Sequence, residues 1–128
     1  MQAIIELFLS FIIYAISVIQ SVSSVEAASV PSQLTEEQLT QVLIETEWPS
    51  DWIPEGLAIA WCESKFSPYA VGDGGNSLGM FQLWTGWFRD GEDPFNPHTN
   101  AAVALRVRHT RGRFGGSGGW TCGDILGI

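Results

Sequence analysis

The stretch from Leu57 to Trp84, LAIAWCESKFSPYAVGDGGNSLGMFQLW, contains the features that decide the fold. It begins as an apolar helical segment that meets a single carboxylate at Glu63. The chain then enters VGDGGNSLG, whose glycines permit positive φ angles and close backbone approach. This segment predicts a short Gly-rich hairpin or an irregular loop. An acid at the end of an apolar helix, beside a sharp turn, is the layout of a functional site.

Two helices are predicted on the N-terminal side of this turn. Thr35 and Gln38 match a capping box, which starts a helix that runs to about Thr46. Pro54 suits the first turn of a second helix, and the segment from Ile53 to Cys62 is apolar on nearly every side. Because a helix without a polar face is usually buried, we expect this second helix to be the buried central helix of the domain.

The rest of the domain is predicted to be helix and loop. The apolar run from Leu78 to Phe88 is expected to restart a helix, and Asn100 to Arg113 reads as another, capped by Thr99. The glycine-rich tail is predicted to be a loop anchored by Trp120. The expected fold class is therefore mainly α, within an α+β arrangement: a small helical domain around a central helix.

The N-terminal residues have the composition of an export signal. Leu7 to Val25 carries no charge, and Val25-Glu26-Ala27 fits a signal-peptidase site. We expect residues 1–27 to be a cleaved signal peptide or, alternatively, an uncleaved membrane anchor, because the apolar run approaches the ~20 residues of a membrane span. Residues 28–34 would be a linker and residues 35–128 the domain. Both alternatives predict a secreted or cell-envelope protein, which meets the membrane only through an uncleaved N-terminal segment.

Cysteine content and charge limit the classes of partner. Cys62 and Cys122 are the only two cysteines, and export would favour a disulfide between them over two buried thiols. A net charge of −8 argues against nucleic acid as a partner. No metal-ligand spacing is present, and no metal or cofactor is expected. The basic residues cluster late in the chain, either as a solvated helix end or as a strip for an anionic polymer: Arg106, Arg108, His109, Arg111 and Arg113.

The surroundings predicted for Glu63 favour acid catalysis. Burial disfavours a charged carboxylate, and the negative end of the helix dipole disfavours it further. Both effects raise the pKa of Glu63 towards that of a group still protonated near neutral pH, as general-acid cleavage of a glycosidic bond requires. The alternative is an ordinary solvated glutamate at a helix end.

Two motifs give the chain a resemblance to a known family. They read Glu63-Ser64-x-Phe66-x-Pro68-x-Ala70-Val71 and Ser77-x-Gly79-Met80-Phe81-Gln82-Leu83. The chain resembles the lysozyme-like superfamily, in particular the soluble lytic transglycosylases and goose-type lysozymes. The likeness covers roughly Thr35 to Cys122. Asn100, followed by two alanines, also resembles the asparagine that opens a later helix in this family.

The resemblance implies a peptidoglycan glycosidase that cleaves the β-1,4 bond between N-acetylmuramic acid and N-acetylglucosamine. Glu63 would be the catalytic acid and base, and the enzyme would act as a monomer on glycan strands without a cofactor. Trp84 is a further candidate to stack on sugar rings. The residues expected to bind substrate are Ser64, Ser77, Gly79, Met80, Phe81, Gln82, Asn100 and Trp120.

The chain departs from the family pattern in ways that leave alternatives open. The late tyrosine motif is absent, and either Trp120 replaces it in the groove or the subsite differs. Asp73 is a turn residue or a second carboxylate; an inverting hydrolase needs a second carboxylate about 6.5–9.5 Å away, whereas a lytic transglycosylase needs none. Other functions considered are a catalytically silent peptidoglycan-binding module and a small membrane-tethered structural protein.

Overall fold

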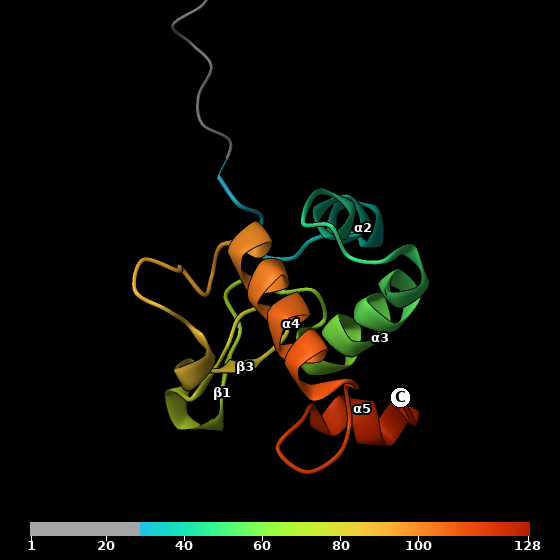
Figure 1. Ribbon diagram of the computed structural model, residues 1–128. Helices are drawn as coiled ribbons and strands as arrows, with labels where there is room; N and C mark the ends of the chain where they lie inside the picture. The colour runs from blue at the N-terminus through green and yellow to red at the C-terminus, as the bar shows by residue number, and fades with distance from the viewer. Residues whose placement is uncertain (1–28) are drawn as a thin grey trace, which may run out of the picture.

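The computed structural model describes residues 29–128, so the expected signal peptide or anchor lies outside the described part (Figure 1). A mainly helical arrangement with one small sheet is confirmed, and the fold is of the α+β kind. The helices are α2 (Glu36–Glu45), α3 (Ile53–Ser64), α4 (Pro97–Arg111) and α5 (Thr121–Leu126). The strands are β1 (Val71–Gly72), β2 (Ser77–Leu78) and β3 (Leu83–Trp84), and single 3-10 turns cover Ser50–Trp52, Asp73–Gly75 and Thr85–Trp87.

The Gly-rich segment folds into a three-stranded antiparallel sheet in the order β1-β2-β3, which confirms the hairpin alternative. The helix predicted over 78–88 is wrong, because this stretch forms β2, a turn, β3 and a 3-10 turn. The reason is the backbone conformation: Gly79 has φ +77° and Gln82 has φ +46°, and neither angle fits a right-handed helix. Of the apolar side chains that suggested a helix, Met80, Phe81 and Leu83 are buried in the core, whereas Trp84 is exposed.

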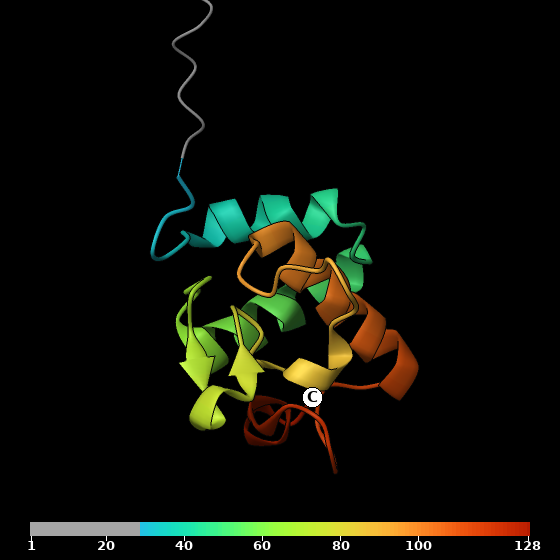
Figure 2. The ribbon, with the colours of Figure 1, turned by 90° about the vertical axis from the view of Figure 1, so that its left-hand side faces the viewer.

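Helix α4 is more deeply buried than α3, with six buried residues against three. In Figure 1 α4 crosses the middle of the molecule, and in Figure 2 it descends from beneath α2 on the side away from the strands. One side of α3 faces solvent, where Trp61 is 47% exposed. The neighbouring elements therefore do not cover all the apolar side chains of α3. Helix α3 is therefore buried on one face only, and not on nearly every side as its composition predicted. The buried residues of α3 are Gly56, Ile59 and Ala60, and those of α4 are Pro97, Asn100, Ala101, Val103, Ala104 and Val107.

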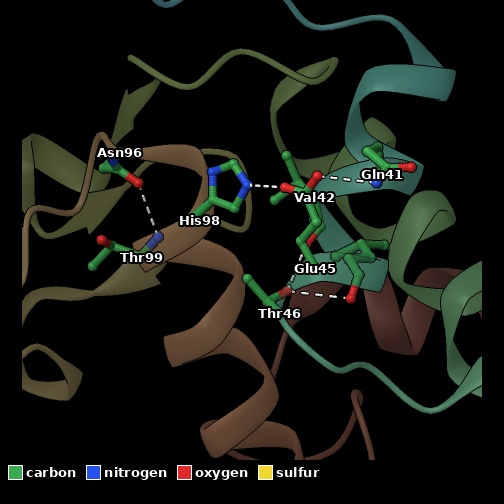
Figure 3. Close-up of polar contacts among 8 residues, drawn as sticks. Gln41, Val42, Glu45, Thr46, Asn96, His98 and Thr99 are labelled. Carbon is green, nitrogen blue, oxygen red and sulfur yellow. Dashed lines mark hydrogen bonds and ion pairs between the residues drawn. The ribbon is translucent and has the colours of Figure 1, made fainter.

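The ends of α2 and α4 follow from local capping chemistry. The capping box of Thr35 and Gln38 is confirmed at α2. Helix α4 starts at Pro97, three residues earlier than predicted, because the Asn96 side chain accepts a hydrogen bond from the Thr99 amide (Figure 3). An Asn-Pro pair is a strong helix start, since proline at the first position loses no helical hydrogen bond.

A half-exposed ion pair joins the first turn of α4 to the last turn of α2. The His98 imidazole contacts the Glu45 carboxylate, which also accepts a hydrogen bond from Gln41 (Figure 3). The hydrogen bond from His98 is the main reason that the pKa of Glu45 lies below its ordinary value. Because both side chains are well solvated, this contact aligns the two helices more than it stabilises them.

The core is built around the Trp48 ring. This ring stacks on Phe81 and Phe114, with centroids 5.3 Å and 6.2 Å away, and its Nε1 donates to the Ala101 carbonyl at 3.0 Å. Helix α3 can approach the ring because residue 56 is glycine: a Cβ there would lie 2.6 Å from the Trp48 ring. Trp48 thereby connects α3, α4 and the turn that follows β2.

The C-terminal segment is tied to α3 by the predicted Cys62–Cys122 disulfide, which is confirmed. The two cysteines are 60 residues apart, and closing a loop of that length contributes about 4 kcal/mol in the chain-entropy model. The tail is not all loop as predicted, since α5 forms within it. Within residues 29–128, no helix is both long and apolar enough to cross a membrane.

Asn100 provides a test of what holds the sheet against α4. Its Nδ2 donates to the carbonyls of Leu78 and Pro94 at 3.1 and 2.9 Å, and its Oδ1 accepts from the Phe81 amide at 3.1 Å. We expect Asn100→Ala to lower the free energy of unfolding by about 3 kcal/mol, because buried backbone groups lose their partners. Chemical denaturation measures this. The matched control Ala102→Ser, exposed on the same helix, should change it by less than ~0.5 kcal/mol; equal effects of the two substitutions would contradict the prediction.

Candidate functional site

An open groove of about 550 Å³ lies between the sheet and the C-terminal segment. Figure 2 shows these two parts facing each other, with the strands above the C-terminal segment. Such a volume is within the range of ligand sites, about 300–1,000 Å³. The groove is lined by Glu63, Asp73, Asn76, Ser77, Gln82, Leu83, Trp84, Trp87, Val107, Gly118, Gly119, Trp120 and Thr121.

Glu63 lies in this groove at the end of α3 and is half buried. Its Oε1 accepts a hydrogen bond of 3.3 Å from the backbone amide of Cys122. Burial is the main reason that the pKa of Glu63 is raised above its ordinary value; the Cys122 amide lowers the pKa, and the charge of Asp73 raises it again. Glu63 is thus a carboxyl group whose surroundings favour the protonated form while leaving one face open to the groove.

The chain turns sharply directly after Glu63 and Ser64. Lys65 and Phe66 both have left-handed backbone angles, with φ of 54° and 61°, which end α3 without a glycine. The N-terminal residues stabilise this turn, since the Gln33 side chain donates to the Lys65 carbonyl at 2.9 Å and the Leu34 amide to the Phe66 carbonyl at 3.0 Å. Part of the expected linker is therefore packed against the turn that carries Glu63.

Asp73 lies across the groove from the helix end, in the 3-10 turn between β1 and β2. It is exposed, it has φ +51°, and its carboxylate accepts a hydrogen bond from the hydroxyl of buried Ser77. The two charged residues of the groove are Glu63 and Asp73, so the described lining has no cation to attract an anionic ligand. Asp73 therefore forms part of the turn and also places a second carboxylate in the groove.

Five of the residues predicted to bind substrate lie behind the groove and support it. Gly79, Met80, Phe81 and Asn100 are buried. Ser64 is half buried, and its hydroxyl lies within hydrogen-bond distance of the carbonyls of Met80 (2.7 Å) and Ala60 (3.0 Å). The Ser64 hydroxyl is already paired inside the fold. These five residues therefore position the turn between β2 and β3 relative to α3.

Three of the predicted residues line the groove: Ser77, Gln82 and Trp120. Gln82 has its amide nitrogen bonded to the carbonyls of Ala70 and Gly79 at 3.1 and 3.0 Å, so it shapes the wall beside β1. Trp120 is only 5% exposed and its Nε1 donates to the Phe81 carbonyl at 2.7 Å, which leaves little of its ring for a ligand.

Trp84 is the exposed aromatic side chain of the groove. It is 60% exposed at the end of β3, and its ring rests against the backbone of Gly86, where a Cβ would lie 2.1 Å away. An indole supported on one face and open on the other is suited to stack on a sugar or another flat, weakly polar group. Trp84, rather than Trp120, is therefore the tryptophan whose ring is open to the groove.

Seven residues that line the groove were not predicted from the sequence, and three of them lie in the C-terminal segment. The disulfide is a signal that could have found these three, since a bond between Cys62 and Cys122 must bring the neighbours of residue 122 close to Glu63. The missed residues are Asn76, Leu83, Trp87, Val107, Gly118, Gly119 and Thr121.

The basic cluster of α4 is held by contacts within the domain. Arg106 forms two hydrogen bonds of 3.0 Å with the Glu92 carboxylate, and the Arg108 guanidinium lies 4.3 Å from the Trp52 ring. Arg111 donates to backbone carbonyls of the C-terminal segment. Arg106, Arg108 and Arg111 are thus partly buried and bound within the domain, which differs from the expected solvated helix end and leaves these three side chains less available to an anionic polymer.

Comparison with protein-family models, curated proteins and solved structures finds no match. Within residues 29–128, no group of three or more His, Cys, Asp or Glu side chains is arranged to hold a metal ion. The possible functions of the groove must therefore be argued from Glu63, Asp73 and the surfaces around them.

The raised pKa of Glu63 predicts a cost to stability. A carboxyl whose pKa is higher in the folded state binds its proton more tightly there, so folding loses stability as pH rises from the ordinary pKa of glutamate, about 4.3, through the raised value. We expect Glu63→Gln to raise Tm at pH 7 and to raise it less at pH 4. Thermal denaturation across this range measures the difference; a gap between the two proteins that does not change with pH would contradict it.

Proposed function

We propose that this chain is a lysozyme-like glycosidase that cleaves the β-1,4 bond between N-acetylmuramic acid and N-acetylglucosamine in peptidoglycan, acting as a lytic transglycosylase. The observation that carries the proposal is Glu63: one half-buried carboxyl with a raised pKa, placed in an open groove. A general acid for a glycosidic oxygen needs that combination of a retained proton and an accessible face. The motif resemblance around Glu63 and Gln82 supports the same assignment.

Glu63 would act first as an acid and then as a base. It donates its proton to the bridging oxygen as the glycosidic bond breaks, and the departing strand leaves with a free hydroxyl. The 6-hydroxyl of the same muramic acid then attacks its anomeric carbon and returns a proton to Glu63, which gives a 1,6-anhydro product without water. The Cys122 amide would stabilise the carboxylate between these two steps.

The groove offers surfaces suited to an uncharged sugar chain. Trp84 would stack on a sugar ring, while Ser77 and Gln82 lie along the same wall. The two carboxylates would disfavour anionic groups inside the groove, so the proposal places the peptide stems of the strand outside it. No cofactor or nucleic acid is part of this proposal, and the enzyme would work as a monomer.

A lysozyme-type hydrolase is the second candidate, because Asp73 faces the same groove. In that case Asp73 would activate a water molecule and the product would carry a reducing end instead of an anhydro ring. We propose a secreted or envelope location for either enzyme. The Cys62–Cys122 disulfide supports it, since such bonds persist in oxidising compartments.

Glu63→Gln tests the proposal directly. We expect it to lower the rate of cell-wall lysis by about 10²–10⁴-fold, because glutamine has the same shape but no proton to donate. A turbidity assay on purified cell walls measures the rate. Glu55→Gln is the matched control, since Glu55 lies in the first turn of the same helix and outside the groove lining, and it should keep full activity. Undiminished lysis by Glu63→Gln would reject the assignment, and wild-type protein that binds walls without cleaving them would indicate a silent binding module.

Asp73→Asn distinguishes the two reactions. For the transglycosylase we expect released muropeptides one water lighter than hydrolysed ones, and an Asp73→Asn variant that stays active. Because the charge of Asp73 raises the pKa of Glu63, its removal should move the alkaline limb of the activity profile to lower pH. Mass spectrometry and a pH–rate profile measure these outcomes. A reducing-end product together with loss of activity in Asp73→Asn would establish the hydrolase instead.

A further inference from the structure

One wall of the groove has almost no side chains of its own. We call residues 115–119, Gly-Gly-Ser-Gly-Gly, the glycine wall; Gly118 and Gly119 line the groove opposite the sheet. Gly116 and Gly118 have φ of +89° and +75°, which glycine adopts readily. The same freedom makes such a segment flexible unless other groups hold it, since glycine loses the most conformational entropy on ordering. One hydrogen bond of 2.8 Å lies within the wall, from the Gly119 amide to the Gly116 carbonyl, and its other contacts are with residues outside it.

Arg111 holds the carbonyl side of the glycine wall. It lies in the last turn of α4, and its Nη2 is within donor distance of the carbonyls of Gly115 (3.2 Å), Ser117 (3.2 Å) and Gly116 (3.4 Å). The wall curves closely around the guanidinium, because a Cβ at Gly119 would lie 2.5 Å from Nη2. The two hydrogens of this nitrogen are thus shared among three backbone carbonyls, of which that of Gly116 also accepts a hydrogen bond of 2.8 Å from the Gly119 amide.

Asp124 holds the amide side of the same wall. Its Oδ1 accepts a hydrogen bond of 2.7 Å from the Gly116 amide, and a Cβ at Gly115 would lie 2.7 Å from that oxygen. The base of the wall is closed by the Trp120 amide, which donates to the Phe114 carbonyl at 2.9 Å. The wall is therefore held from α4 by Arg111 and from α5 by Asp124.

We propose that Arg111 is a positioning residue, which with Asp124 fixes the glycine wall in the place where it binds the glycan strand. The inference rests on the proposed function for the identity of the ligand. Lysine is a poor replacement for Arg111, because the wall fits closely around the planar guanidinium. Cβ atoms at Gly118 and Gly119 would lie 3.4 Å from Nη1 and 2.5 Å from Nη2, whereas an ammonium is a compact point charge. The contacts of Arg111 and Asp124 affect glycan binding and not Glu63, because the Cys62–Cys122 disulfide holds in place the Cys122 amide that donates to Glu63.

The test compares Arg111→Lys with the wild type in exchange, binding and catalysis. Hydrogen exchange of the Gly116 and Gly119 amides should speed up on the order of tenfold, the equivalent of about one charged hydrogen bond. KM for glycan strands should rise by a similar factor while kcat changes less than about twofold, because Glu63 keeps its surroundings. Arg89→Lys is the matched control, since Arg89 is exposed and outside the groove lining, and it should change none of these values.

Asp124 supplies the second pair of variants. Asp124→Ala removes the acceptor of the Gly116 amide and should reproduce the rise in KM, whereas Asp124→Asn keeps an oxygen in that place and should restore most of the affinity. Near-ultraviolet circular dichroism shows whether each variant retains the native packing around Trp120. A purely structural role would lower Tm in both variants without separating KM from kcat, and that result would overturn the proposal.

Binding measured without catalysis separates this proposal from the enzymatic one. In a Glu63→Gln background, purified glycan strands are titrated and tryptophan fluorescence gives Kd, which Arg111→Lys should raise about tenfold. If the wild type binds strands without cleaving them and this rise appears, the enzymatic function fails and the wall proposal stands. If the wild type cleaves strands but Arg111→Lys changes neither Kd nor amide exchange, the wall proposal fails alone. Wild-type protein that neither binds nor cleaves overturns both.

Discussion

The packing of Trp48 against Phe81 and Phe114 is the interaction on which the rest of the structure depends. These rings come from three distant parts of the chain: the link between α2 and α3, the turn between β2 and β3, and the start of the C-terminal segment. Trp120 extends the cluster by packing on Phe114 and by donating to the Phe81 carbonyl. The sheet side and the C-terminal side of the groove both pack on this aromatic cluster. The packing of its rings therefore sets the distance between the two sides.

The proposed chemistry of the groove depends on a half-buried carboxyl group, whose charged form lowers the stability of the fold. Glu63 is half buried at the negative end of a helix, and burial raises its pKa and lowers the stability of its charged form. The fold tolerates this because the Cys122 amide satisfies one carboxylate oxygen and the disulfide holds that amide close to α3. The disulfide thus contributes both stability and the position of a hydrogen-bond donor at the proposed reaction centre.

Much of the local structure could be read from the sequence where short-range chemistry decides it. The capping box at Thr35 and the proline start of α3 depend on residues within a few positions of one another, as does the Gly-rich turn, for which the sequence left hairpin and irregular loop open. The helix predicted over 78–88 failed because of contacts between distant segments. Leu78 to Phe88 is apolar enough for a helix, yet buried Asn100 bonds the backbone at Leu78 and Phe81, and left-handed Gly79 and Gln82 turn the chain. Those contacts lie too far apart in sequence for periodicity to reveal them.

The sequence by itself determined that an acid stands at the end of an apolar helix before a glycine turn, and that Cys62 has only Cys122 as a partner. Those conclusions need only residue types and spacing. Tertiary structure alone decided which side chains meet Glu63, because the groove joins the sheet to a tail some 60 residues further along the chain. It also decided that Met80, Phe81 and Asn100 support the groove from behind while Trp84 faces it, since burial depends on packing between segments that the sequence does not place.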